Sequence, residues 1–149
     1  MTVIKVGGAV CLQDDVLDDV ATAARAGPLA VVHGGGPQLD AALASLGPVA
    51  RRQGLRVTSP EAASIVANVL DGVGQAITEA LVARGVRAIH VPSSHRLFVA
   101  TVTDPELGRV GQEVWADPCR LVLPPGCVPV VTPVAWDNHG TLNINADEG

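Results

Sequence analysis

Lys5 is the only lysine of the chain, and it stands where a positive charge could bind an anion. It lies in the apolar segment Thr2–Val6, directly before the pair Gly7-Gly8. A lysine within a buried strand is costly unless a carboxylate or another anion pairs with it. A lysine on an exposed edge strand would need no such partner. We favour the first alternative, in which Lys5 neutralises a phosphoryl or carboxylate oxygen.

Two glycine-rich turns follow two apolar segments that are typical of buried parallel strands. Gly7-Gly8 follows the first segment, and Gly34–Gly36 follows Leu29–His33. Glycines let the backbone approach a ligand closely. A helix that begins at Pro37 would aim its first N–H groups at the same place. Because ligands of open parallel sheets bind beyond the carboxyl ends of the strands, the turns predict a carboxylate or phosphoryl site. The alternative is that both are only tight strand-to-helix turns.

Further polar candidates lie elsewhere along the chain. Arg56 lies on a loop that leads into a helix, where a guanidinium can bind a carboxylate through two hydrogen bonds. Asn143, Asn145 and Asp147 occupy alternate positions, so in an extended segment they would share one face. Their amides could bind an amide or a carboxylate, and Asp147 could pair with Lys5. A polar turn at a frayed terminus is the alternative for this segment.

Several other kinds of site are excluded by spacing. The chain has neither a GxGxxG nor a GxxxxGK[ST] motif, and no GxSxG follows its HGGG, which excludes an esterase. The four histidines and three cysteines have no metal-ligand spacing, so no metal site is predicted. We expect His33, beside the glycine turn, to support the loop rather than to catalyse.

The predicted elements form an α/β fold: a three-layer sandwich with a mainly parallel sheet, helices on both faces and an antiparallel hairpin excursion. Predicted strands are Thr2–Val6, Leu29–His33, Arg87–Val91 and Val128–Thr132, with a hairpin of Leu97–Thr103 and Arg109–Trp115. Predicted helices are Asp14–Ala26, Pro37–Leu46, Pro60–Arg84 and a short one at Cys119–Leu123.

The longest predicted helix carries two informative patterns. Thr58 and Glu61 have the spacing of a capping box, and Ser59 before a proline is an alternative cap. Gly72 and Gly74 lie inside this helix, where each costs ~1 kcal/mol relative to alanine. We interpret both glycines as positions of close packing against a neighbour.

Composition limits the class of protein. The chain has 149 residues, of which 48% are apolar and 17% charged, so we expect one ordered domain. A net charge of −5 and three aromatic residues argue against nucleic acid as a partner. An odd, sparse set of cysteines suits a reducing compartment. Without a signal sequence or an apolar run of about 20 residues, we expect a cytoplasmic protein with no membrane partner.

The motifs together resemble those of N-acetylglutamate kinases, which are members of the amino acid kinase family. KVGGAV at 5–10, VVHGGGPQLD at 31–40, GLRVT at 54–58 and NINAD at 143–147 occur in the same order and at the same spacing. The resemblance covers essentially residues 1–149 and corresponds to the family's N-terminal, substrate-binding half. By resemblance, the family's C-terminal ATP-binding half, with its second lysine, is expected to be absent from this chain.

The resemblance implies roles for the groups that handle phosphate. The family transfers the γ-phosphoryl group of ATP, with Mg²⁺, to the side-chain carboxylate of N-acetyl-L-glutamate. Lys5 would neutralise charge on that phosphoryl group, and Asp147 would orient the lysine. Gly7, Gly8 and Gly34 would line the phosphate path.

It implies roles for substrate-binding groups as well. Gly35 and Gly36 would offer backbone N–H groups, Arg56 would bind the α-carboxylate, and Asn143 would bind the acetylamino end. The family acts in arginine biosynthesis and commonly forms homodimers through this half. We expect the isolated chain to bind substrate weakly and to be inactive, with the ATP and Mg²⁺ site mostly in the missing half.

Two alternatives remain open at this stage. The chain could be a non-catalytic amino-acid-binding or dimerisation module. It could also belong to relatives that phosphorylate carrier-linked aminoadipate or glutamate in lysine biosynthesis, although GLRVT favours the free acetylated substrate. One segment departs from the family, because His90–Leu97 replaces its usual glycine-rich stretch after the third strand.

Overall fold

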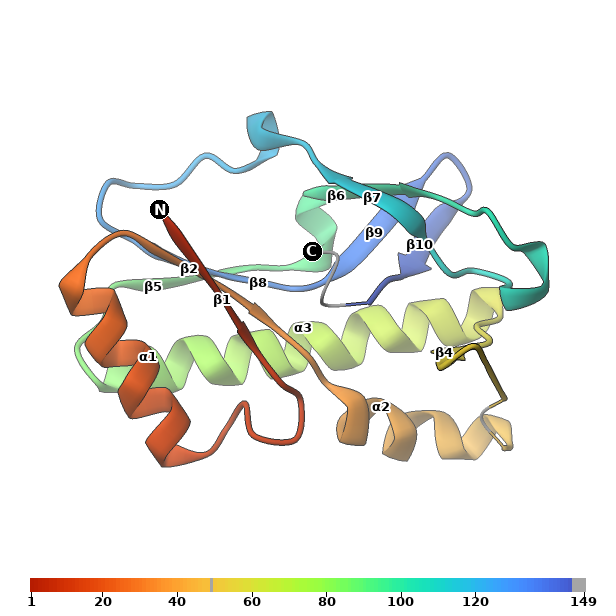
Figure 1. Ribbon diagram of the computed structural model, residues 1–149, viewed down its shortest axis with the longest axis horizontal. Helices are drawn as coiled ribbons and strands as arrows, with labels where there is room; N and C mark the ends of the chain where they lie inside the picture. Colours follow the sequence, from red (N-terminus) through yellow and green to blue (C-terminus); the bar gives the residue numbers. More distant parts are fainter. Residues whose placement is uncertain (49, 146–149) are drawn as a thin grey trace.

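Four parallel strands form the central sheet, in the order β1-β2-β8-β5 (Figure 1). The computed structural model describes residues 1–48 and 50–145. The strands are β1 (Thr2–Val6), β2 (Leu29–His33), β5 (Ala88–Val91) and β8 (Val128–Val131). Because all four run the same way, the two glycine turns leave the sheet side by side. The predicted parallel sheet is confirmed, with β8 inserted between β2 and β5.

A second, smaller sheet follows in the order β10-β9-β6-β7. Its strands are β6 (Phe98–Thr101), β7 (Gln112–Ala116), β9 (Val134–Asp137) and β10 (Gly140–Asn143). The predicted antiparallel hairpin is confirmed as β6 and β7, with a register shift between Val99 and Thr101. The segment of Arg51 to Arg56 forms a separate two-stranded hairpin, β3 (Arg51–Arg52) and β4 (Leu55–Arg56).

Three α-helices match the predicted ones closely: α1 (Asp14–Ala26), α2 (Gly36–Leu43) and α3 (Pro60–Ala83). Ser59 caps α3, since its side chain accepts a hydrogen bond from the Ala62 N–H at 3.1 Å. The capping box at Thr58 was wrong, because that hydroxyl donates to the Arg56 carbonyl instead. Short 3₁₀ helices are η1 (Ala44–Leu46), η2 (Ser93–His95), η3 (Pro105–Leu107) and η4 (Pro118–Arg120). The short helix predicted at Cys119–Leu123 is thus a 3₁₀ turn, η4, which begins one residue earlier and ends at Arg120.

The α-helices lie together on one face of the parallel sheet rather than on both (Figure 1). Leu17 of α1 and Ile77 of α3 share one buried cluster with Val31 of β2. The opposite face presents Val32 and Val131, which pack against the second sheet instead. The expectation of helices on both faces is therefore corrected: β-strands and loops supply the third layer.

β1 is an edge strand, which corrects the prediction that it is fully buried. It stands at the end of the sheet order, and only Val6 of its five residues is buried. Lys5 is exposed as a consequence, so burial of the strand does not demand an anion beside it. The position of Lys5 relative to the glycine turns is what matters for the site.

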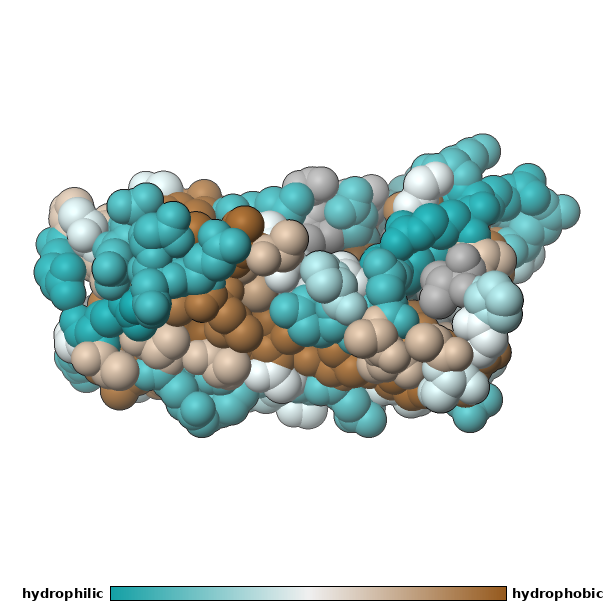
Figure 2. Space-filling model, turned by 90° about the horizontal axis from the view of Figure 1, so that it is seen from below, coloured by the Kyte–Doolittle hydropathy of each residue, from teal (hydrophilic) through white to brown (hydrophobic). Residues whose placement is uncertain are grey.

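α3 is the central helix of the core. Among the described residues it is the one helix long and apolar enough to cross a membrane by length and composition. Its apolar side chains pack against α1, α2, β5, β8 and β10, which accounts for its hydropathy. Apolar residues also form a strip on the helical side of the molecule, between polar surfaces (Figure 2). Close packing at Gly74 is confirmed, whereas Gly72 faces open space.

Candidate functional site

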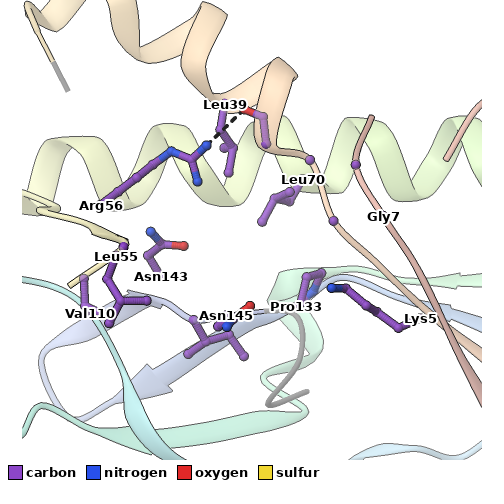
Figure 3. Close-up of a pocket in the computed structure, with 16 residues that line it drawn as sticks. Lys5, Gly7, Leu39, Leu55, Arg56, Leu70, Val110, Pro133, Asn143 and Asn145 are labelled. Atoms are coloured by element: carbon purple, nitrogen blue, oxygen red, sulfur yellow. Dashed lines mark hydrogen bonds between the residues drawn. The ribbon is translucent and has the colours of Figure 1, made fainter. Parts of the chain in front are cut away.

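A cavity of about 230 Å³ lies at the carboxyl ends of β1 and β2, between the two sheets (Figure 3). Predicted site residues line it together: Lys5, Gly7, Gly8, Gly34, Gly35, Gly36, Arg56 and Asn143. Asp147 lies outside the described residues, so its predicted role stays a prediction. The volume is below the ~300–1,000 Å³ usual for drug-sized ligands, which indicates a small guest.

The two glycine turns press directly against each other. The Gly34 N–H donates to the Val6 carbonyl at 2.8 Å, which continues the β1–β2 ladder into the turns. A Cβ on Gly8 would lie 2.5 Å from the Gly35 nitrogen, and one on Gly35 would lie 2.5 Å from Leu70 Cδ2. A side chain at Gly8 would clash with backbone atoms, and one at Gly35 would require the Leu70 side chain to move. The backbone itself therefore forms this wall of the cavity.

Arg56 is fixed at the opposite side of the cavity from Lys5 (Figure 3). Its Nε donates to Asp40 Oδ1 at 2.9 Å, and its Nη2 donates to the Gly36 carbonyl at 3.1 Å. The side chain is only 15% exposed. These bonds leave guanidinium donors over the cavity, because a guanidinium has five N–H groups.

Lys5 enters the cavity from the end of β1. It pairs with Val32 in the ladder, two residues before the glycine turn at the carboxyl end of each strand. The amine end of its side chain points toward the cavity, near Pro133 (Figure 3). A compact ammonium on a flexible stem suits a group that must follow a moving charge. The arrangement therefore places one cation at each side of a small polar cavity.

The second sheet supplies the amide side of the cavity. Asn143 ends β10 and is buried, and its Nδ2 donates to Thr58 Oγ1 at 3.2 Å. Asn145 also lines the cavity, as does Ile144 between the two asparagines, whereas Asp147 lies outside the described residues. Thr58 is bonded in turn to the connection between β6 and β7, since its N–H donates at 2.9 Å to the carbonyl of Leu107 in η3. The Asn143 amide is thus held in a set orientation.

The remaining wall is apolar, formed by Leu39, Leu55, Leu70, Val110 and Ile144. A guest of this cavity would carry negative charge at two places and a short apolar part between them. The described residues contain no cluster of three His, Cys, Asp or Glu side chains that could hold a metal ion.

His33 supports the glycine turn from beneath, as predicted. It is the last residue of β2 and fully buried, and its Nδ1 lies 3.2 Å from the Gly34 carbonyl oxygen. Burial lowers the pKa of this imidazole to about 4, against an ordinary value of 6.5. The ring is therefore neutral at physiological pH and acts by hydrogen bonding, not by charge.

Two supporting residues escaped the sequence analysis. Asp40 orients Arg56, and Thr58 orients Asn143, which lies 85 positions further along the chain. The signal for Asp40 was present, because it lies four residues after Gly36 and so on the same side of α2. No signal for the contact of Thr58 with Asn143 exists in the sequence, since only the fold brings the two together.

Comparison with known proteins gives a consistent result. The amino acid kinase family matches residues 1–149. Acetylglutamate kinase of Thermus thermophilus is 40% identical over 147 residues, covering 97% of this chain and 58% of that protein. Acetylglutamate kinase of Rubrobacter xylanophilus is 38% identical over 151 residues, covering 98% of this chain and 59% of that protein. The chain thus spans less than two thirds of the length of these relatives.

Solved structures agree on the fold. The crystal structure of smu.665 from Streptococcus mutans superimposes with a TM-score of 0.81 at 29% identity, over 99% of this chain and 64% of that one. N-acetylglutamate synthase of Neisseria gonorrhoeae, solved with coenzyme A and N-acetyl-glutamate, superimposes with a TM-score of 0.74 at 19% identity, over 97% of this chain and 36% of that one. The second likeness shows the fold alone. On its sequence match and its fold, the chain belongs to the amino acid kinase family.

Proposed function

We propose that this chain forms the N-acetyl-L-glutamate-binding part of an acetylglutamate kinase, which transfers the γ-phosphoryl group of ATP to the substrate's side-chain carboxylate. The observation that carries the proposal is the small cavity with Lys5 and Arg56 at opposite sides and glycine amides beside them. N-acetyl-L-glutamate has two carboxylates separated by a short apolar stem and one neutral amide, and each of these groups has a counterpart among the cavity residues.

The substrate would be oriented by Arg56 and Asn143. The guanidinium, already held by Asp40 and Gly36, would bind the α-carboxylate without losing much side-chain freedom. The Asn143 amide would hydrogen-bond the acetylamino group. Leu55 and Leu70 would pack along the stem of the substrate. The side-chain carboxylate would then lie toward the glycine turns and Lys5.

The glycine turns and Lys5 would act on the transferring group. ATP would supply the phosphoryl group, whose charge spreads over its oxygens as it moves. Backbone N–H groups at the start of α2 and the Lys5 ammonium would stabilise that charge as it develops. No covalent intermediate with the protein is needed, because positioning and electrostatics supply most of the catalysis in phosphoryl transfer.

The apolar walls favour a free acetylated substrate over a bare amino acid. Val110 and Ile144 lie in the same lining as Asn143, so an acetyl methyl group has an apolar place beside the amide. A free ammonium group in its position would face no carboxylate among the described lining residues.

Calorimetric titration of the 149-residue protein with N-acetyl-L-glutamate tests binding, with L-glutamate as the control that lacks the acetyl group. We expect saturable binding of the acetylated ligand and weaker binding of L-glutamate. Equal affinity for the two would contradict the proposed orientation. Trapping of an acyl phosphate with hydroxylamine, in the presence of MgATP, tests separately whether these residues turn the substrate over or only bind it.

A further inference from the structure

Two imidazoles, of which His33 is buried and His90 is partly buried, meet beneath the glycine turn that lines the cavity. His33 ends β2 and His90 lies on β5, and the Nε2 atoms of both face Gly74 of α3. A Cβ on Gly74 would lie 2.6 Å from His90 Nε2 and 2.9 Å from His33 Nε2. The missing side chain of Gly74 is thus what makes room for both rings.

Hydrogen bonding fixes the proton of the His33 ring. Its Nδ1 lies 3.2 Å from the Gly34 carbonyl oxygen, which can only accept a hydrogen bond. The proton of the neutral ring must therefore be on Nδ1, and Nε2 carries a lone pair. That Nε2 atom is buried and has no hydrogen-bond partner among the described residues. The ring's directed interaction is thus with Gly34.

The bond to Gly34 sets the direction of the next amide. The carbonyl of Gly34 and the N–H of Gly35 belong to one planar trans peptide unit, in which the two groups point in opposite directions. When His33 holds the carbonyl on its own side, the Gly35 N–H must point away from the ring. The Gly35 nitrogen lies close to Gly8, because a Cβ on Gly8 would be 2.5 Å from it, and both glycines line the cavity.

Polar groups of α3, β5 and the end of β8 brace His33 in turn. His90 Nε2 lies 3.0 Å from Thr132 Oγ1, just before the cavity residue Pro133. Asp71 of α3 lies 3.9 Å from His90 Nε2, and it accepts from both the N–H and the hydroxyl of Ser93. The ring of His33 therefore rests against a hydrogen-bonded layer and not against loose packing.

We propose that His33 is a positioning residue that aims the Gly35 N–H into the anion site, with His90 and Gly74 holding its ring in place. The inference rests on the proposed function of the cavity for its ligand, N-acetyl-L-glutamate. Its structural part, the control of a peptide plane by an imidazole, can be measured without any ligand.

Two substitutions of similar shape separate hydrogen bonding from packing. The amide nitrogen of His33→Asn lies as many bonds from Cα as Nδ1 does, so it can donate to Gly34 in the same way. His33→Leu has nearly the same shape as the asparagine variant but no donor. We expect His33→Leu to weaken binding of N-acetyl-L-glutamate roughly tenfold, the value of one hydrogen bond. His33→Asn should stay within about threefold of the wild type.

Glycine-selective ¹⁵N spectra give the readout that needs no ligand. The Gly35 and Gly36 amide resonances should shift in His33→Leu and return toward their wild-type positions in His33→Asn. Imidazole ¹⁵N spectra of the unmodified protein should show the proton on Nδ1 of His33. A proton on Nε2 would overturn the proposal even if the leucine variant does not fold.

The other outcomes are equally decisive. Unchanged glycine amides in His33→Leu, or equal damage by leucine and asparagine, would refute control of the peptide plane by this ring. If the wild-type protein does not bind N-acetyl-L-glutamate, the proposed function fails, while the glycine spectra still decide whether His33 orients the turn. Normal spectra with normal binding in both variants would leave His33 as a packing residue only.

Discussion

Arg56 and Asp40 join the β3–β4 hairpin to α2. The Arg56 Nε lies 2.9 Å from Asp40 Oδ1, and the same guanidinium also bonds the Gly36 carbonyl. Asp40 lies four residues after Gly36, so both partners stand on one side of the helix. The cation and the glycine amides therefore move as one unit, and a change at Arg56 alters both.

Substitution of Arg56 by lysine should weaken binding of N-acetyl-L-glutamate about 10- to 100-fold, because the three donors of a compact ammonium cannot serve Asp40, Gly36 and both oxygens of a carboxylate as a planar guanidinium can. Arg51→Lys is the matched control: Arg51 also reaches Asp40, at 3.3 Å, but does not line the cavity. We expect the control to bind within about twofold of the wild type. Calorimetric titration of both variants makes the comparison. An equal loss of affinity in the two variants would mean that Arg56 does not bind the ligand.

Gly8→Ala should disrupt the glycine turns, whereas Gly7→Ala should not. The Cβ added at Gly8 would meet backbone atoms of Gly35 at 2.5 Å, but at Gly7 the nearest atom is 4.0 Å away. Overpacking of this kind costs ~1–3 kcal/mol. Urea unfolding should show that loss for Gly8→Ala alone. A Gly8→Ala protein as stable as the wild type would mean that the turns are not packed as described.

The local elements of this fold could be read from the sequence, but their placement could not. Apolar spacing gave both α1 and α3 to within about one residue, and the predicted cap at Ser59 marked the start of α3. Alternation gave the β6–β7 hairpin, because Phe98 and Ala100 of β6 are buried and the partly buried Val114 of β7 packs against the same cluster. The insertion of β8 between β2 and β5 depends on contacts across many residues, which no local pattern records.

Lys5 illustrates the same limit within the site. An apolar, β-branched segment reads as a buried strand, yet β1 is at the edge of the sheet and the lysine is exposed. The order of the strands in the sheet decides whether β1 is buried or exposed. As expected, Lys5 nonetheless lines one cavity together with both glycine turns. Motif spacing therefore predicted which residues meet, while their burial depended on the sheet.

Gly74→Ala should destabilise the protein, whereas Gly72→Ala should stabilise it. Both residues lie inside α3, but an added Cβ meets two imidazoles at Gly74 and open space at Gly72. Alanine gains about 1 kcal/mol over glycine in an exposed helical position, whereas a clash in a packed core costs ~1–3 kcal/mol. Thermal and urea unfolding of the two variants should give opposite signs. A shared sign would contradict the histidine packing.

The stability of the protein should fall as the pH is lowered from about 6.5 toward 4, because of His33. Burial lowers the pKa of this ring to about 4 in the folded state, whereas the unfolded chain binds the proton near 6.5. Between these values the unfolded state holds more protons, so the free energy of unfolding rises with pH. The full shift corresponds to about 3 kcal/mol.

His33→Asn isolates this contribution, because asparagine does not titrate and can keep the bond to Gly34. Urea unfolding at several pH values should give a flatter profile for the variant than for the wild type between pH 4 and 6.5. His90, whose pKa burial also lowers, should leave a smaller residual slope in both proteins. Parallel profiles would mean that His33 is protonated or solvated in the folded state, and that the ring does not hold the glycine turn as a neutral donor.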